Sequence, residues 1–180
     1  NNVINTVKQD ADLYFVVNDG GFTKNAIQID ASENGAVLLP NDAQYLKLGA
    51  SQDFNLQHNG VDSGIENMTG HLYISNYAND KDIIFRSDDG SGGLTAYLTL
   101  DGSVGYTQAS VNIRFADNAK LQVGASADLE LNHDGTDSTI SNKTGDLYIT
   151  NTLDDKDIIL QSDDGSGGVT NYLVLDGSAT

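Results

Sequence analysis

The chain contains no cysteine and no tryptophan, and only one proline and one methionine among its 180 residues. Without cysteine no disulfide can cross-link the fold, and nothing follows about the redox compartment. Basic residues are also scarce, because nine Lys and Arg stand against 26 Asp and Glu, which gives a net charge of −17. This deficit argues against a nucleic-acid partner, since contacts to phosphates require clustered basic side chains. We expect an acidic, highly soluble surface.

Long apolar runs are missing as well. No apolar segment approaches the ~18 residues of a membrane span, so we expect no membrane insertion. The first residues lack the basic stretch and apolar core of a signal peptide. Helical periodicity is also absent, because no window keeps apolar residues three and four positions apart behind a capping residue.

The chain does contain a repeat. Residues 82–93 (DIIFRSDDGSGG) recur as residues 157–168 (DIILQSDDGSGG), an offset of 75 (82 + 75 = 157). The offset holds without a gap between residues 46–103 and 121–178, and about 37 of about 58 aligned pairs are identical. The repeat therefore predicts one packing surface that is used more than once.

A third, partial copy opens the chain. Residues 12–32 match the second half of the later units, with a small deletion in the turn. We therefore divide the chain into a partial repeat at 1–43, a first unit at 44–118 and an incomplete second unit at 119–180. Because the pattern begins and ends in the middle of a unit, we expect the fragment to belong to a longer chain.

Alternating apolar and polar residues predict strands in an all-β fold. Examples are the runs at 45–48, 54–57, 72–74 and 98–100. Each 75-residue unit is expected to hold about six strands, spaced roughly every 8–12 residues. Asn-Gly and Asp-Gly pairs after the runs favour tight hairpin turns with positive φ at both central residues. These turn signals, together with Thr69-Gly70, are Asn59-Gly60, Asp89-Gly90, Asp101-Gly102, Asp134-Gly135 and Asp176-Gly177.

Such short strands give each unit a thin core of about a dozen inward residues, and small units bury proportionally little surface. The missing burial must come from the neighbouring repeat, from another chain, or from both. We therefore favour stacked repeats in an elongated homo-oligomer, while packing arguments alone leave the number of copies open. Three copies would carry a charge of −51 (3 × −17). Their repulsion opposes assembly at low salt and fades at high salt.

Three successive phrases carry a family resemblance: residues 118–124 (NAKLQVG), 128–140 (DLELNHDGTDSTI) and 144–149 (TGDLYI). They resemble the repeats of tail-fibre proteins from tailed bacteriophages, marine phages especially. The likeness covers most of residues 44–180, and the first unit departs from it at Asn59, where the usual residue is Asp.

This resemblance implies a homotrimeric, rod-like β-structured fibre, a β-helix-like or β-prism-like shaft, in the tail of an extracellular virion. Repeated shaft modules usually act as spacers that support host attachment. The implied partners are two further copies of the chain and other virion tail proteins. A host-surface glycan or protein would bind at a distal tip, and nothing in this chain matches such a tip.

Asp88 and Asp89, with their copies Asp163 and Asp164, are candidate metal ligands, because hard oxygens on a flexible glycine-rich loop suit calcium. The spacing matches neither the helix–loop–helix calcium loop nor the calcium β-roll nonapeptide. We favour the alternative of a wide hairpin loop whose side chains cap their own backbone, and we expect no cofactor.

His58 and His133 occupy equivalent positions in the two units. On a three-fold axis such a residue could face its symmetry mates and hold a metal. We favour a half-buried histidine bonded to a neighbouring turn. His71 has no counterpart, because Asp146 replaces it, and we assign it no role.

We expect no catalytic residues and no enzymatic activity. The carboxylates fall in exposed turns, away from the aromatics that would shape a sugar groove or raise a pKa, and no nucleophile-elbow motif is present. Four tyrosines at strand positions could contact carbohydrate weakly, although cross-strand packing accounts for them. They are Tyr73, Tyr97, Tyr148 and Tyr172.

Two alternatives stay open. A bacterial surface adhesin or calcium-loaded β-solenoid would also be repetitive and acidic, and a chelator would lower its melting temperature. A tailspike-type polysaccharide hydrolase would need two close, buried carboxylates in an aromatic groove, and would release reducing ends from host polysaccharide.

Overall fold

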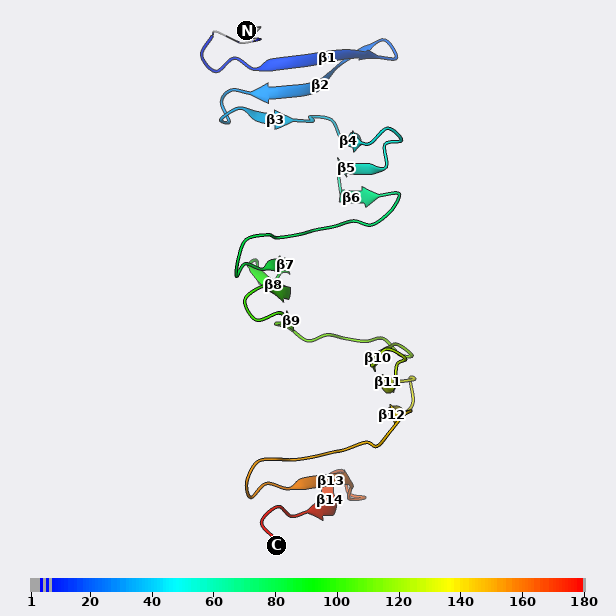
Figure 1. Cartoon of the computed structure of the whole chain (residues 1–180). Coiled ribbons are helices and arrows are strands. Elements are labelled where there is room, and N and C mark those ends of the chain that lie inside the picture. The colour runs from blue at the N-terminus through cyan, green and yellow to red at the C-terminus, as the bar shows by residue number, and fades with distance from the viewer. Residues whose placement is uncertain (1–3, 5, 7, 180) are drawn as a thin grey trace. The chain divides into compact units, whose positions relative to one another are not determined.

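The computed structural model describes residues 4, 6 and 8–179, and this part of the chain is built of strands and loops with no helix. The strands form five small antiparallel sheets (Figure 1), which confirms the all-β prediction. No helix in the described part is long and apolar enough to cross a membrane. The chain divides into two compact units, Asn1–Ile83 and Ile84–Thr180.

Two kinds of sheet alternate along the chain. The long-hairpin sheets are β1-β2-β3, β7-β8-β9 and β13-β14, and the short-strand sheets are β4-β5-β6 and β10-β11-β12. Residues 44–118 hold six strands, β4 to β9, as the sequence predicts. The bounds are β1 Leu13–Asp19, β2 Phe22–Asp30, β3 Ala36–Leu38, β4 Gln44–Leu48, β5 Phe54–His58, β6 Ser63–Asn67, β7 Ile83–Asp88, β8 Leu94–Asp101, β9 Tyr106–Ala109, β10 Lys120–Val123, β11 Leu129–His133, β12 Ser138–Asn142, β13 Ile158–Asp163 and β14 Val169–Leu175.

The opening hairpin and the last hairpin share their irregularities. The register of β1 with β2 shifts between Phe15 and Val16, and that of β13 with β14 shifts between Leu160 and Gln161, the same step of each hairpin. In both, the aspartate before the first strand accepts a hydrogen bond from a backbone N–H just beyond the second strand. The pairs are Asp12 with Ala31 at 3.0 Å and Asp157 with Gly177 at 3.0 Å.

The hairpin loops at the Asn-Gly and Asp-Gly signals are wider than predicted, whereas β1 and β2 join through the two-residue turn Gly20-Gly21, in which both residues have positive φ. In the loop after β5 only Gly60 has positive φ, at 98°. Asn59 keeps an ordinary φ, and its Oδ1 accepts N–H bonds from Val61 at 2.9 Å and Asp62 at 2.8 Å. The prediction of positive φ at both central residues is therefore wrong. The Asn side chain satisfies the loop's backbone donors, so the chain closes without straining a non-glycine residue.

The predicted strand at 72–74 does not form in the single chain. Residues 71–77 and their copies 146–152 run extended without a strand partner, and Figure 1 shows no arrow between β6 and β7 or between β12 and β13. The alternation of the sequence is that of a strand, but a strand exists only where another strand supplies the hydrogen-bonding edge. Within its own unit, neither segment meets such an edge.

No hydrophobic core is present among the described residues. No apolar side chain there is buried, and the two buried residues are polar, Asn55 and Glu130. Within either unit, the backbones of neighbouring strands approach one another only inside single sheets, and the described side chains that join two sheets of the first unit are polar. The sequence predicts burial by the neighbouring repeat, by another chain, or by both. Within a unit, the neighbouring repeat buries none of the described apolar side chains.

The exposed surface shows the size of this deficit. The chain exposes 14705 Å². A compact protein of 19.1 kDa exposes about 8,400 Å², and two separate compact halves would expose about 10,100 Å² together. The chain therefore buries only about 47% of its unfolded surface, whereas about 70% is usual at this size. This shortfall is too large for a self-sufficient globular fold.

Candidate functional site

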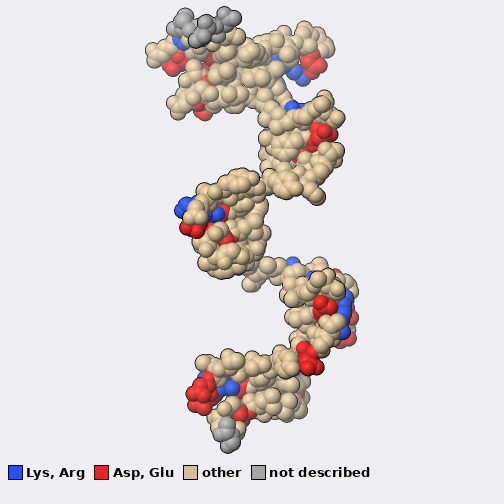
Figure 2. All heavy atoms as spheres, viewed as in Figure 1, with Lys and Arg blue, Asp and Glu red and all other residues tan. Residues whose placement is uncertain are grey.

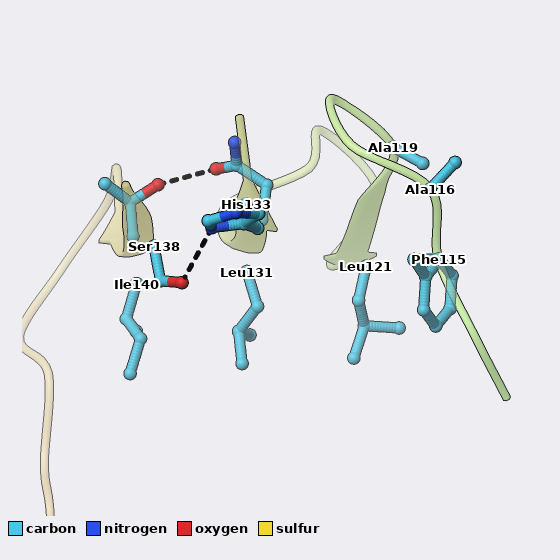
Figure 3. Close-up of a pocket in the computed structure, with 10 residues that line it drawn as sticks. Phe115, Ala116, Ala119, Leu121, Leu131, His133, Ser138 and Ile140 are labelled. Atoms are coloured by element: carbon cyan, nitrogen blue, oxygen red, sulfur yellow. Dashed lines mark hydrogen bonds between the residues drawn. The ribbon is translucent and has the colours of Figure 1, made fainter. Parts of the chain in front are cut away.

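Each short-strand sheet has one apolar face. Leu121, Leu131 and Ile140 are paired in register across β10, β11 and β12, so their side chains form one row. Figure 3 shows the three side chains, together with Phe115, pointing to the same side of the sheet. All four are exposed. The first short-strand sheet repeats the row in register with Leu46, Leu56 and Ile65.

An open groove of about 520 Å³ lies along this row in the second short-strand sheet. Phe115, Ala116 and Ala119 line one side of it, and Ile140 lines the other (Figure 3). The lining is mainly apolar, and one of its polar contacts is the bond between His133 and Ser138. The groove offers a binding surface for apolar side chains, and the polar residues in its lining are bonded to one another in two pairs, His133 with Ser138 and Asn132 with Thr139.

The pocket at the corresponding end of the first short-strand sheet is smaller, about 330 Å³, and more polar, and the apolar row Leu46, Leu56 and Ile65 does not line it. There the amides of Asn41 and Gln44 reach back to the preceding long-hairpin sheet. Asn41 Nδ2 donates to the carbonyl oxygen of Asn25 at 2.7 Å, and Gln44 Nε2 donates to that of Ala26. Ala116 and Ala119 stand at these positions in the second repeat and have no amide to donate.

The opposite face of the second short-strand sheet carries an ion cluster in which a buried carboxylate is held by two partly exposed lysines. Glu130 is 5% exposed, and its carboxylate accepts hydrogen bonds from Lys143 at 2.7 Å, Lys120 at 2.9 Å and Gln122 at 2.7 Å. The bond from Lys143, followed by those from Lys120 and Gln122, lowers the pKa of Glu130 from its ordinary 4.5 to about 2. The cluster joins β10, β11 and the residue after β12 into one unit.

Sequence reasoning missed this cluster, although the two repeats contain the signal. Three positions change together between them, from uncharged residues in the first repeat to a complementary set of charges in the second. Tyr45, Asn55 and Met68 become Lys120, Glu130 and Lys143. Such coordinated differences at a fixed offset indicate side chains that meet in space.

Replacing Glu130 by glutamine is expected to remove an acid-sensitive part of the stability. A carboxyl whose pKa is lowered by folding stabilises the fold above its unfolded pKa, near 4.5, and this contribution is lost as the pH falls towards about 2. The difference in unfolding free energy between the parent and Glu130→Gln should therefore shrink over this window. Urea melts from pH 7 to pH 2 measure it.

The matched control is Glu66→Gln on β6, which removes the same charge where the structure records no ion pair for that residue. The difference in unfolding free energy between the parent and Glu66→Gln should vary less with pH than the difference between the parent and Glu130→Gln. Equal pH dependence in the two variants would show that net charge, rather than the ion cluster, controls the acid response.

The candidate metal ligands lie in wide hairpin loops. Oδ1 of Asp89 accepts three hydrogen bonds, from Ser91 Oγ at 2.7 Å, the Ser91 N–H at 2.8 Å and the Gly93 N–H at 3.1 Å. These bonds lower the pKa of Asp89 below its ordinary 3.8, the Ser91 hydroxyl contributing most. Asp88 Oδ1 accepts the Gly90 N–H at 2.7 Å. The copies Asp163 and Asp164 repeat these contacts with Gly165, Ser166 and Gly168.

This geometry matches the backbone-capping loop favoured from the sequence. Across the described residues, no three acidic or histidine side chains come together in a way that could hold a metal ion. One oxygen of each aspartate, Oδ1, accepts hydrogen bonds from backbone or hydroxyl donors of the same loop.

The two equivalent histidines are exposed rather than half-buried, which corrects the expectation from the sequence. His58 Nδ1 lies 3.2 Å from Ser63 Oγ, and His133 Nδ1 lies 3.1 Å from Ser138 Oγ. Each serine faces its histidine across the strand pair rather than lying in a turn. The single chain has no second layer of structure to bury the imidazole.

The four tyrosines fall into two pairs. Tyr97 and Tyr172 donate their hydroxyls to the carbonyls of Asp88 at 2.9 Å and Asp163 at 3.1 Å, across their own hairpins. Tyr73 and Tyr148 lie in the unpaired extended segments and are 79% and 81% exposed. Cross-strand packing within the chain therefore does not account for this second pair.

The charges leave wide uncharged areas between them. Figure 2 shows the acidic and basic side chains in small scattered groups on the face in view, with most of that surface uncharged.

No family model, curated protein or solved structure matches this chain. The exposed apolar rows are thus the strongest indication of what the protein does.

Proposed function

We propose that this chain is a non-enzymatic structural module, a spacer, in the shaft of a homotrimeric, elongated fibre of the bacteriophage tail-fibre kind. One observation carries the proposal: no apolar side chain of the described chain is buried, although every sheet presents apolar residues. In the assembled fibre, copies of the chain cover these faces.

The long-hairpin sheets need cover on both faces. In β13-β14, Leu160 pairs with Leu173, and the next pair, Ile159 with Val174, lies on the other face because side chains alternate along a strand. All four side chains are exposed. A sheet that is apolar on both faces is stable in water only when structure packs on both sides.

The area to be covered matches an obligate interface. Relative to two compact halves, the chain exposes an excess of about 4,600 Å². Obligate oligomers bury about 2,000–5,000 Å² or more per interface. A transient contact of about 1,200 Å² would leave most of the apolar rows in water.

The repeat indicates that the covering partner is the same chain. The apolar row of the short-strand sheets recurs after 75 residues with the same register. A partner that covers both rows must present matching surfaces at the same interval, which another copy does by construction. The number three, the fibre and the place in a virion tail come from the sequence resemblance.

The polar groups favour a structural role over catalysis or calcium storage. The recurring aspartates bond to their own loops. Glu130, the carboxylate that is buried among the described residues, is neutralised by Lys120 and Lys143. Neither arrangement provides a carboxylate with a raised pKa in a groove that could bind sugar.

Changing the number of repeats tests the spacer role. Inserting a further copy of residues 44–118 after residue 118 should lengthen the particles seen by negative-stain electron microscopy, and deleting residues 44–118 should shorten them by the same increment. Particle width should stay constant in both variants. Globular particles, or a length that does not follow the repeat number, would contradict the proposal.

A further inference from the structure

Two extended segments, residues 71–75 and 146–150, have no strand partner in the part of the chain that the structure describes. Among the described residues, no backbone hydrogen bond joins either segment to any other residue. Both contain Leu-Tyr-Ile, three residues that favour strands. The extended backbone and exposed side chains are those of an unpaired strand, and in water such a strand is a template for pairing.

The same contacts hold both segments at their two ends. At the start, Asn67 Nδ2 donates to the carbonyls of Thr69 and Gly70 at 2.8 and 3.1 Å, and Asn76 Nδ2 donates to that of Asp82 at 3.0 Å at the end. The second repeat has the same bonds, from Asn142 to Thr144 and Gly145 and from Asn151 to Asp157. Such clamps lower the entropy cost of pairing because the segment is already extended.

We propose that these segments are the inter-chain strands of the assembly, and that each pairs through its backbone with a second copy of this chain. The inference rests on the proposed function and specifies which part of the chain makes the contact. The exposed apolar residues of each segment, such as Leu72 and Ile74, would then be covered by the neighbouring copy.

Three observations favour a second copy over another protein. The segment recurs after 75 residues with the same clamps, so its partner needs two matching strands at that interval. Apart from Asp146 at the start of the second segment, residues 71–75 and 146–150 carry no acidic or basic side chain other than His71, which limits the direct repulsion between chains of −17 each at this contact. The chain also exposes more surface than a compact chain would, and this excess area is as large as an obligate interface between copies.

Hydrogen exchange of the unmodified protein tests the pairing. In the assembled state, alternate amides within residues 72–75 and 147–150, those that face the partner strand, should exchange about 100-fold or more slowly than unprotected amides. In the dissociated chain they should exchange at the unprotected rate. Gly92 and Gly167, at the hairpin tips, are internal controls, and their amides should exchange rapidly in both states.

A proline variant tests the same point through the backbone. Among the described residues, no backbone hydrogen bond uses the N–H of Tyr73 or Ile74. Because successive N–H groups point to opposite edges of a strand, one of the two faces the partner, and the proline variant that removes it, Tyr73→Pro or Ile74→Pro, should raise the concentration at half-assembly by about tenfold. The matched control is Asn79→Pro, which falls at the second residue of the Ala78–Lys81 turn, where proline fits. Its half-assembly concentration should change less than about twofold.

The outcomes separate this inference from the proposed function. Slow exchange of alternate amides in the two segments, together with weakened assembly of Tyr73→Pro or Ile74→Pro, supports it. An oligomer whose segment amides all stay unprotected, or whose assembly tolerates both Tyr73→Pro and Ile74→Pro as well as Asn79→Pro, overturns it and leaves the proposed function standing. A protein that sediments as a monomer under all salt conditions overturns both.

Discussion

Replacing Leu131 by aspartate is expected to convert the assembled protein into single chains at micromolar concentration. Leu131 is the centre of the apolar row and is 39% exposed in the single chain, so a carboxylate there stays in contact with water before assembly. In the assembly it would be desolvated without a partner, which costs several kcal/mol in each copy. At 1.4 kcal/mol per tenfold, association should weaken by at least about 1,000-fold. Sedimentation velocity measures the change.

Asn132→Asp is the matched control for this substitution. Asn132 follows Leu131 in β11, and its side chain alternates to the opposite face, where Oδ1 accepts a hydrogen bond from Thr139 at 2.6 Å that a carboxylate can also accept. Asn132→Asp adds the same charge as Leu131→Asp but places it on the face away from the apolar row. This variant should therefore stay assembled. Equal dissociation of both variants would assign the effect to charge, and assembly of both would show that the apolar row is not an interface.

Lowering the salt concentration is expected to dissociate the assembly. Three copies carry −51 (3 × −17), and acidic side chains outnumber basic ones by 26 to nine. The Debye length falls from about 30 Å at 0.01 M salt to about 3 Å at 1 M, so sodium chloride removes most of the repulsion between copies. We expect the half-assembly concentration to fall at least about 100-fold between these conditions.

Calcium chloride at matched ionic strength separates screening from specific binding. Screening predicts that calcium and sodium salts promote assembly to similar extents. A saturable response to micromolar calcium would instead favour the calcium-loaded adhesin or solenoid. Assembly that does not vary with salt would contradict the electrostatic part of the account.

Most strands could be predicted from the sequence, because alternation and turn residues are local properties. The runs at 45–48, 54–57 and 98–100 lie in β4, β5 and β8, each beside a neighbouring strand of the same sheet. The run at 72–74 has the same pattern, yet it stays unpaired because pairing depends on a partner strand that its unit does not supply. Pattern alone cannot distinguish a strand paired within the chain from one that needs another chain.

The loops and the ion cluster show two other limits. A Gly after Asn or Asp marks a turn, but the width of the turn depended on the capping bonds of residues such as Asn59, which the dipeptide does not reveal. The sequence does not identify Glu130 as buried, because Glu130, Lys120 and Lys143, taken singly, each have the character of a solvated surface residue. Only comparison of the two repeats reveals that Glu130, Lys120 and Lys143 changed together.

Dilution followed by two simultaneous readings tests the central claim most directly. Sedimentation equilibrium in 1 M sodium chloride should give a mass near 57 kDa, three times 19.1 kDa. On dilution, the β signal in circular dichroism should be lost over the same concentration range in which the mass falls, because a chain without a core does not hold its sheets alone. A 19.1 kDa monomer that keeps its full β signal and melts cooperatively would contradict the account.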